Sequence, residues 1–169
     1  MKNPFKNTTF LFGVTKYQNL PEDIGTEIIL SGRSNAGKSS ALNAITQNRK
    51  LARISKTPGR TTEINFFQVE ENFKLLDLPG YGYAKLSKDS IKKINSTLEN
   101  YFLKRKQLLA AFVLIDIRHD CFEIDLNFMK WLNKNLIPFD IIFTKADKLK
   151  SCEIEIYKGK YINLSLIHI

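Results

Sequence analysis

The chain has 169 residues, 43% of them hydrophobic and 25% charged, and its 26 basic and 17 acidic residues give a net charge of +9. These values predict one globular domain over residues 1–169 and exclude a disordered chain. The only cysteines, Cys121 and Cys152, lack metal-ligand spacing, which excludes a disulfide framework and a zinc ribbon and is typical of a reducing compartment. The longest apolar run, residues 108–115, is far shorter than the roughly 20 residues of a membrane-spanning helix, so we expect a cytoplasmic protein.

The positive charge has two interpretations. Excess basic side chains favour partners rich in phosphate, which for a cytoplasmic protein usually means RNA. The excess can also reflect composition alone, because 20 of the 26 basic residues are Lys, and Ile and Asn are abundant too. Lys reads bases less specifically than Arg, so we expect contact with nucleic acid rather than recognition of a base sequence.

Strands and helices alternate along the chain. Short β-branched or continuous apolar runs indicate the strands, and apolar residues at helical spacing indicate the helices. The expected strands cover 26–31, 63–69, 73–77, 110–116 and 139–143, and the expected helices begin at 38 and cover 87–106 and 123–133. This alternation predicts an α/β, Ras-like fold: a mostly parallel sheet with one antiparallel edge strand and helices on both faces.

A phosphate-binding loop is predicted between the first of these strands and the first helix. The segment fits the pattern GxxxxGK[ST] and consists of Gly32, Arg33, Ser34, Asn35, Ala36, Gly37, Lys38 and Ser39. Its glycines allow successive backbone N–H groups to face a phosphate, and the following helix adds the positive end of its dipole. Lys38 is expected to reach the β- and γ-phosphates, and the Ser39 hydroxyl is expected to ligate Mg²⁺.

A second motif closes the strand at 73–77. Asp77, Leu78, Pro79 and Gly80 have the form DxxG. Asp77 is expected to hold Mg²⁺ through a water molecule, and the N–H group of Gly80 is expected to face the γ-phosphate.

A third motif indicates which base is bound. Thr144, Lys145, Ala146 and Asp147 have the form [NT]KxD and follow a strand. The Asp147 carboxylate can accept hydrogen bonds from N1–H and the 2-amino group of guanine, whereas adenine offers neither donor. Lys145 is expected to lie along the purine face. Because the carboxyl ends of parallel strands meet at one edge of the sheet, the three motifs together predict a GTP site.

An irregular segment at residues 56–62 occupies the place of a mobile switch. Gly59, Arg60, Thr61 and Thr62 are expected to contact the nucleotide, and one threonine should ligate Mg²⁺ only while a γ-phosphate is present. Thr61 and Thr62 compete for this role, and we favour Thr61. Lys38, Thr61 and Gly80 are the expected catalytic groups, which act by position and charge.

Four strings of the sequence together resemble one family. GRSNAGKSS at 32–40, TPGRT at 57–61, DLPGYGYA at 77–84 and TKADK at 144–148 are similar to those of the EngB (YihA) family of bacterial GTPases. The resemblance extends from about Phe10 to Lys148. It implies a Ras-like fold, Mg²⁺-dependent GTP hydrolysis, a role for Thr61 at the Mg²⁺ ion, and a part in assembly of the large ribosomal subunit, with ribosomal RNA and proteins as partners. We also expect a monomer. The family is also needed for normal cell division and septation.

Two residues bear on the rate of hydrolysis. Tyr81 stands where many small GTPases carry a glutamine that orients the attacking water, so we expect slow intrinsic hydrolysis. Tyr81 and Tyr83 can equally be packing residues or contacts to RNA. Asn35 is similar to a residue that helps related GTPases to bind K⁺; the alternative is that it only makes hydrogen bonds within its loop.

The sequence departs from the family at its end. Residues 148–160 leave room for one short helix, and residues 161–165 for a last strand. Leu164, Ser165 and Leu166 are the remnant in which a backbone N–H group would contact guanine O6. We expect either a fragment or a reduced form of the domain.

Three functions are compatible with these motifs. The first is a slow GTPase switch in ribosome assembly, and the second is a GTP-dependent RNA-binding module that does not hydrolyse GTP. The third, a P-loop kinase or ATPase, is disfavoured by the TKAD motif. Basic residues near the switch segments favour contact with ribosomal RNA in the first two cases; they are Arg49, Lys50, Arg53, Lys56, Arg60, Lys85, Lys88, Lys92 and Lys93.

Overall fold

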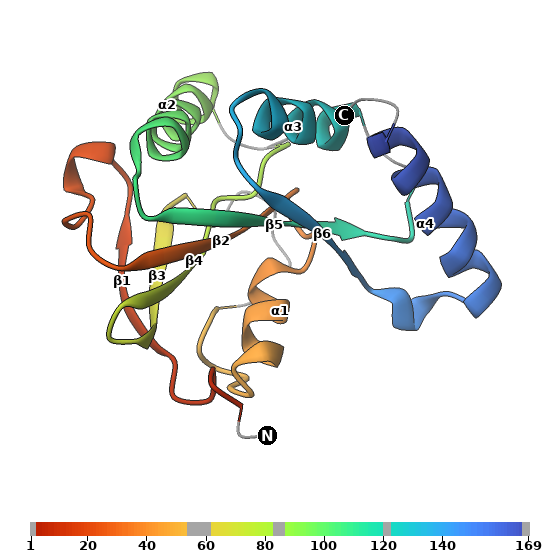
Figure 1. Ribbon diagram of the computed structural model, residues 1–169, viewed down its shortest axis with the longest axis horizontal. Helices are drawn as coiled ribbons and strands as arrows, with labels where there is room; N and C mark the ends of the chain where they lie inside the picture. Colours follow the sequence, from red (N-terminus) through yellow and green to blue (C-terminus); the bar gives the residue numbers. More distant parts are fainter. Residues whose placement is uncertain (1–2, 54–61, 83–86, 120–122, 167–169) are drawn as a thin grey trace.

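A six-stranded sheet forms the centre of the computed structural model, in the order β1-β3-β4-β2-β5-β6 (Figure 1). Residues 3–53, 62–82, 87–119 and 123–166 are described, with the backbone alone for 161–166. In chain order the elements are β1 Thr9–Val14, η1 Tyr17–Asn19, β2 Thr26–Gly32, α1 Lys38–Ile45, β3 Ile64–Glu70, β4 Phe73–Asp77, α2 Lys88–Lys104, β5 Leu108–Asp116, α3 Glu123–Lys134, β6 Phe139–Thr144, η2 Ala146–Lys148 and α4 Ser151–Leu166.

The predicted fold class is confirmed, with one difference at the sheet edge. β2 pairs in parallel with β4 and β5, and β5 with β6, whereas β3 runs antiparallel to β4 and to β1. The sequence pattern does not predict β1. Because β1 lies outside β3, the antiparallel strand β3 is second from the edge of the sheet and not at the edge as expected. A register shift between Phe10 and Phe12 breaks the two-residue alternation that reveals a strand. The two rings pack on Phe67 and Phe66, which belong to core clusters on opposite faces.

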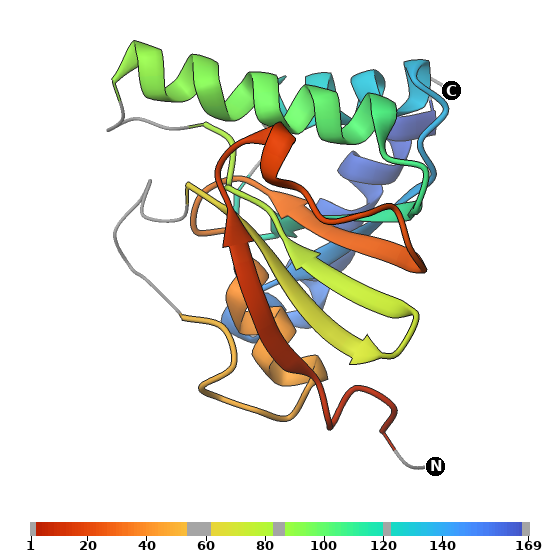
Figure 2. The same cartoon turned by 90° about the vertical axis from the view of Figure 1, so that its left-hand side faces the viewer.

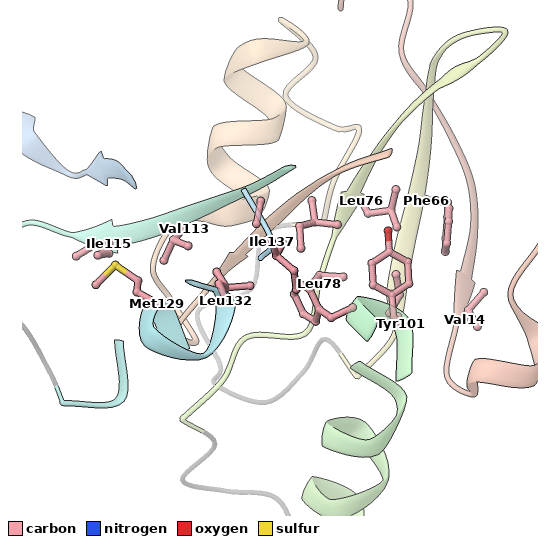
Figure 3. Packing of buried hydrophobic residues seen from close by; sticks show 14 residues of the cluster. Val14, Phe66, Leu76, Leu78, Tyr101, Val113, Ile115, Met129, Leu132 and Ile137 are labelled. Atoms are coloured by element: carbon pink, nitrogen blue, oxygen red, sulfur yellow. The ribbon is translucent and has the colours of Figure 1, made fainter. Parts of the chain in front are cut away.

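The core has one layer on each face of the sheet. Successive strand residues alternate between the layers, so Ile29 and Val113 belong to the layer under α2 and α3, in which Figure 3 labels Val113. Leu30 and Leu114 pack on the other face, which α1 covers (Figure 1). Burying each such side chain contributes about 1.5–3 kcal/mol. Along the described residues, no helix is both long and apolar enough to pass through a membrane.

A buried polar network anchors α2 to the amino end of β2. Glu27 is fully buried and accepts two hydrogen bonds from the Arg105 guanidinium, at 2.7 and 2.9 Å, and one from the Tyr101 hydroxyl at 2.7 Å. Arg105 also pairs with Asp23 at 2.6 Å. Burial and the adjacent Glu27 carboxylate raise the pKa of Tyr101 well above its usual value. The network holds the helix over the sheet at the end opposite the predicted motifs.

The prediction for the end of the chain was wrong. One helix, α4, covers residues 151–166, where a short helix and a strand at 161–165 were expected. Its start is stabilised locally, because the Lys150 N–H group donates to the Glu153 carboxylate at 2.8 Å while the Glu153 N–H group donates to the Lys150 carbonyl at 3.0 Å. The proposed guanine loop is therefore corrected: Leu164, Ser165 and Leu166 lie in the last turn of this helix.

Candidate nucleotide-binding site

The phosphate loop joins β2 to α1 as expected. Gly37 has φ 97° and precedes the first residue of α1, Lys38. A residue with a Cβ atom is strained in this left-handed conformation, which explains the glycine at the point where the loop turns into the helix. The loop therefore lies directly before a helix N-terminus, the arrangement that favours a bound phosphate.

Lys38 and Asp77 are both buried at this loop, and their charges influence each other. The Lys38 ammonium donates to the carbonyls of Gly32 at 3.1 Å and Arg33 at 3.3 Å. Burial lowers the pKa of Lys38, although Asp77 opposes the shift. Burial likewise raises the pKa of Asp77, against the effects of Lys38 and of a hydrogen bond from Ser39. Both charges thus lie in a site with little water, where an added phosphate or cation interacts strongly.

The residues around Asp77 fit a magnesium ion. The Ser39 hydroxyl donates to Asp77 Oδ2 at 2.8 Å. The other carboxylate oxygen, Oδ1, is buried and accepts no hydrogen bond from the described residues. Hydroxyl and carboxylate oxygens are the ligands that Mg²⁺ prefers. A buried carboxylate oxygen without a hydrogen-bond partner is energetically costly, and a bound cation would remove that cost.

The DxxG segment lies directly against the phosphate loop. A Cβ atom on Gly80 would come within 2.7 Å of the Ser34 backbone nitrogen and 3.0 Å of Lys38 Nζ, so only glycine fits here. Two backbone bonds join the segments: the Ser34 N–H group donates to the Tyr81 carbonyl at 3.0 Å, and the Tyr81 N–H group donates to the Gly32 carbonyl at 3.3 Å. Leu78 and Pro79 are buried behind them. Two of the predicted motifs are thus adjacent.

The Tyr81 side chain packs toward α3. Its hydroxyl donates to Asp125 at 2.8 Å, and its ring lies 4.9 Å from that of Phe128. Asp125 is buried, and burial raises its pKa against the opposing effects of Tyr81 and Arg33. Of the two interpretations of Tyr81, the structure supports packing. Tyr83 lies outside the described residues.

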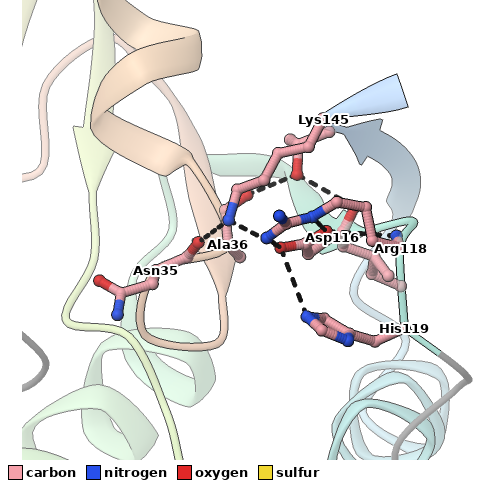
Figure 4. A network of polar contacts seen from close by, with 8 residues as sticks. Asn35, Ala36, Asp116, Arg118, His119 and Lys145 are labelled. Atoms are coloured by element: carbon pink, nitrogen blue, oxygen red, sulfur yellow. Dashed lines mark hydrogen bonds and ion pairs between the residues drawn. The ribbon is translucent and has the colours of Figure 1, made fainter. Parts of the chain in front are cut away.

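The TKAD motif also reaches the phosphate loop, as Figure 4 shows. The Lys145 ammonium donates to the Asn35 carbonyl at 2.8 Å and to Asp116 at 2.7 Å. The Thr144 hydroxyl donates to the carbonyls of Ala36 at 2.6 Å and Ile115 at 3.2 Å. These contacts join β5, β6 and the phosphate loop at the carboxyl edge of the sheet.

Asp116 belongs to the candidate site although none of the three motifs contains it. Burial acts to raise its pKa, but hydrogen bonds from Arg118 and Lys145 outweigh this and hold the pKa well below its usual value. Arg118 contributes three bonds, two from its guanidinium at 2.7 and 2.9 Å and one from its backbone N–H group at 3.2 Å. The sequence held one signal, because Asp116 ends a continuous apolar run that predicts a buried strand. Its contact with Lys145 follows only from the sheet order, in which β5 lies next to the phosphate-loop strand β2.

The remaining predicted residues differ in how the structure places them. Asp147 is exposed beyond Lys145 and pairs with Lys148 at 3.0 Å; this contact lowers the pKa of Asp147. Ala146 begins η2 between them. Thr62 is half-buried, whereas Gly59, Arg60 and Thr61 lie outside the described residues. A pocket of about 420 Å³ separates the phosphate loop from the start of α3, with Asp116 and Lys145 in its wall.

These features define the class of protein. A phosphate loop after a central parallel strand, a DxxG segment packed on it and a TKAD motif at the same edge make the chain a P-loop GTPase. The family model described as "50S ribosome-binding GTPase" matches residues 27–145.

The comparisons also show the family. A probable GTP-binding protein EngB of Photorhabdus laumondii is 47% identical over 144 residues, 85% of this chain and 69% of that protein. Another from Phocaeicola vulgatus is 46% identical over 153 residues, 90% of this chain and 76% of that protein. A crystal structure titled as a probable GTP-binding protein engB aligns with a TM-score of 0.66 at 25% identity, covering 83% of this chain and 80% of the other. The chain belongs to the EngB family.

Proposed function

We propose that the chain hydrolyses GTP slowly and acts as a nucleotide-dependent switch in assembly of the large ribosomal subunit. The observation that carries this proposal is the contact of three motifs at one sheet edge: Gly80 against Ser34, and Lys145 against Asn35. A base bound at the TKAD motif and phosphates bound at the loop can therefore belong to one nucleotide.

Each group has a defined task in this reaction. Lys38 turns from the loop carbonyls to the β- and γ-phosphates, and the Gly80 N–H group faces the γ-phosphate as negative charge develops there. Asp147 accepts from guanine, and Lys145 covers the purine face. Ser39, Asp77 and Thr61, which lies outside the described residues, would hold the metal; a bound Mg²⁺ would neutralise charge on the β- and γ-phosphates.

The slow rate follows from Tyr81. A tyrosine side chain has no amide to orient the attacking water, and the Tyr81 hydroxyl is engaged by Asp125 while its ring packs on Phe128. A K⁺ ion near Asn35 would add positive charge beside the phosphates, as an arginine finger does in other GTPases. The second candidate, a GTP-dependent RNA-binding module that does not turn over, rests on the same side-chain position.

The ribosomal role is supported by charge and by family. The chain carries a net charge of +9, and the family model that matches it is described as ribosome-binding. We accordingly propose a cytoplasmic monomer whose partners are the RNA and proteins of the large-subunit precursor, with a consequent role in cell division.

The test begins with a titration of the 169-residue chain with fluorescent GDP and GTP, competed by ATP, in K⁺ and then in Na⁺ buffer. Guanine-selective binding with K⁺-stimulated turnover supports the switch, whereas binding without turnover in either buffer supports the second candidate. Sedimentation with purified large subunits, with GDP or a non-hydrolysable GTP analogue, tests the partner. Equal sedimentation of the chain with GDP and with the GTP analogue would overturn the proposed switch.

A further inference from the structure

A groove of about 800 Å³ lies away from the nucleotide site, between α2 and the segment that carries η1. Figure 2 shows η1 directly below α2. The groove residues are Thr15, Lys16, Tyr17, Gln18, Thr62, Ser90, Lys92, Lys93, Ile94, Ser96, Thr97, Asn100 and Lys104. Nearly all are basic or carry a hydroxyl or amide group.

The sequence of α2 explains why this wall is polar. Ile94, Tyr101 and Phe102 face the core, and the residues at helical spacing beside them form a separate stripe. Lys93, Thr97, Asn100 and Lys104 follow one another by three or four residues and therefore lie on one side of the helix. The Thr97 hydroxyl donates to the Thr15 carbonyl at 3.3 Å, which fixes the distance between the two walls.

The charge of the groove is uniform. Four lysines line it, namely Lys16, Lys92, Lys93 and Lys104, and none of the lining residues is a carboxylate. Four ammonium groups around one concave surface repel one another unless anions are bound there. A chain of phosphates spaced along a flexible backbone satisfies such a surface better than a single small anion does.

An aromatic ring lies within this basic surface. Tyr17 is half-buried in η1, and the Lys104 ammonium lies 5.5 Å from the centre of its ring. A basic groove that includes an aromatic side chain is typical of proteins that bind single-stranded nucleic acid, because bases stack on the ring while the phosphates meet the lysines. The ring favours RNA over an acidic peptide.

The groove also touches the two parts of the chain that the proposed switch would move. Thr62 ends the predicted switch segment, and α2 is the first helix after the DxxG motif. A displacement of either segment therefore changes the width of the groove.

We propose that this groove binds an unpaired stretch of RNA, with phosphates at the lysines and a base stacked on Tyr17, and that the bound nucleotide controls its affinity. The proposal rests on the proposed function for its switch and adds the surface and the chemistry of the partner.

The test measures fluorescence anisotropy of a labelled 12-nucleotide oligouridylate with the full chain, in GDP or a non-hydrolysable GTP analogue, over a series of KCl concentrations. Lys93→Gln with Lys104→Gln removes two phosphate contacts and should lower the slope of log affinity against log salt by about 1.4. Tyr17→Leu should weaken binding about tenfold through lost stacking, whereas Tyr17→Phe, which keeps the ring, should bind as the unmodified chain does. The matched control is Lys130→Gln with Lys134→Gln on α3, which should leave the slope unchanged.

Two results would overturn the proposal, and they differ from failure of the proposed function. If the α3 control weakens binding as much as the groove variant does, binding follows net charge and the groove has no special role. If affinity is the same with both nucleotides, control by the switch is excluded. Fluorescent GDP binding by the same variants, together with sedimentation of the unmodified chain with large subunits, tests the proposed function independently of the groove.

Discussion

Asp116→Asn should weaken guanine-nucleotide binding although Asp116 belongs to none of the three motifs. Its carboxylate accepts from Lys145 and Arg118, and Lys145 in turn contacts the phosphate loop at Asn35. A hydrogen bond to a charged group contributes about 1.5–3 kcal/mol. Because the Lys145 side chain is 30% exposed and asparagine still accepts one bond, we expect a loss of about 1 kcal/mol, which is about fivefold in affinity.

The assay is a titration with fluorescent GDP, with and without competing ATP. Selectivity for guanine should not change, because the Asp147 carboxylate is intact. Arg118→Gln is the matched control, since it removes the exposed Arg118 guanidinium from Asp116 but leaves the contact with Lys145 in place, and it should leave affinity unaltered. Unchanged affinity in Asp116→Asn, or equal losses in the two variants, would refute the view that Asp116 positions Lys145.

The pH dependence of stability gives a second readout of the same group. The pKa of Asp116 is lowered in the folded state, so its stabilising contribution is present above the ordinary value of 3.8 and is lost as the pH falls toward the lowered value. Asp116→Asn should therefore lose less stability than the unmodified chain from about pH 4 downward. Urea unfolding at a series of acid pH values measures this difference.

Three further changes test other parts of the fold. Gly80→Ala puts a Cβ atom 2.7 Å from the Ser34 nitrogen, so the phosphate loop must shift; single-turnover hydrolysis should fall about 100-fold, and an unchanged rate would contradict the packing. Arg105→Met leaves Glu27 buried without its cation and should lower the free energy of unfolding by about 3–5 kcal/mol in urea, with recovery when Glu27→Met is added. Burial raises the pKa of the Asp125 carboxyl, so the unmodified chain should lose stability as the pH rises from about 4 and this group ionises. Asp125→Asn should not show this loss. The same dependence of the unfolding free energy on pH in both proteins would exclude the effect.

Local patterns were sufficient for the elements that carry strong signals. β2 and β5 are apolar runs buried on both faces, and α2 begins one residue after Ser87, whose hydroxyl accepts from the Ser90 N–H group as a cap. The two failures have physical causes. β1 contains a register shift that destroys its alternation, and α4 depends on its own capping residues rather than on an apolar stripe.

The candidate site likewise contains some residues that sequence patterns indicate and others that they do not. The motifs fix Lys38, Asp77 and Lys145 because the spacing of each motif serves a local geometry. Asp116 and Asp125 act through contacts with residues distant in sequence, and only the sheet order and the packing of α3 bring those partners together. No pattern along the chain alone encodes such pairs.

The central place of β2 has a consequence for synthesis of the protein. The phosphate loop is complete once Ser39 has been made, but its strand is flanked by β4 and β5, and Lys145 reaches the loop from beyond β6. Because the nascent chain emerges amino end first, its nucleotide site stays incomplete until these later segments have been made. Affinity for nucleotide should appear only once residue 147 is free to fold, which protects shorter nascent chains from premature capture of nucleotide.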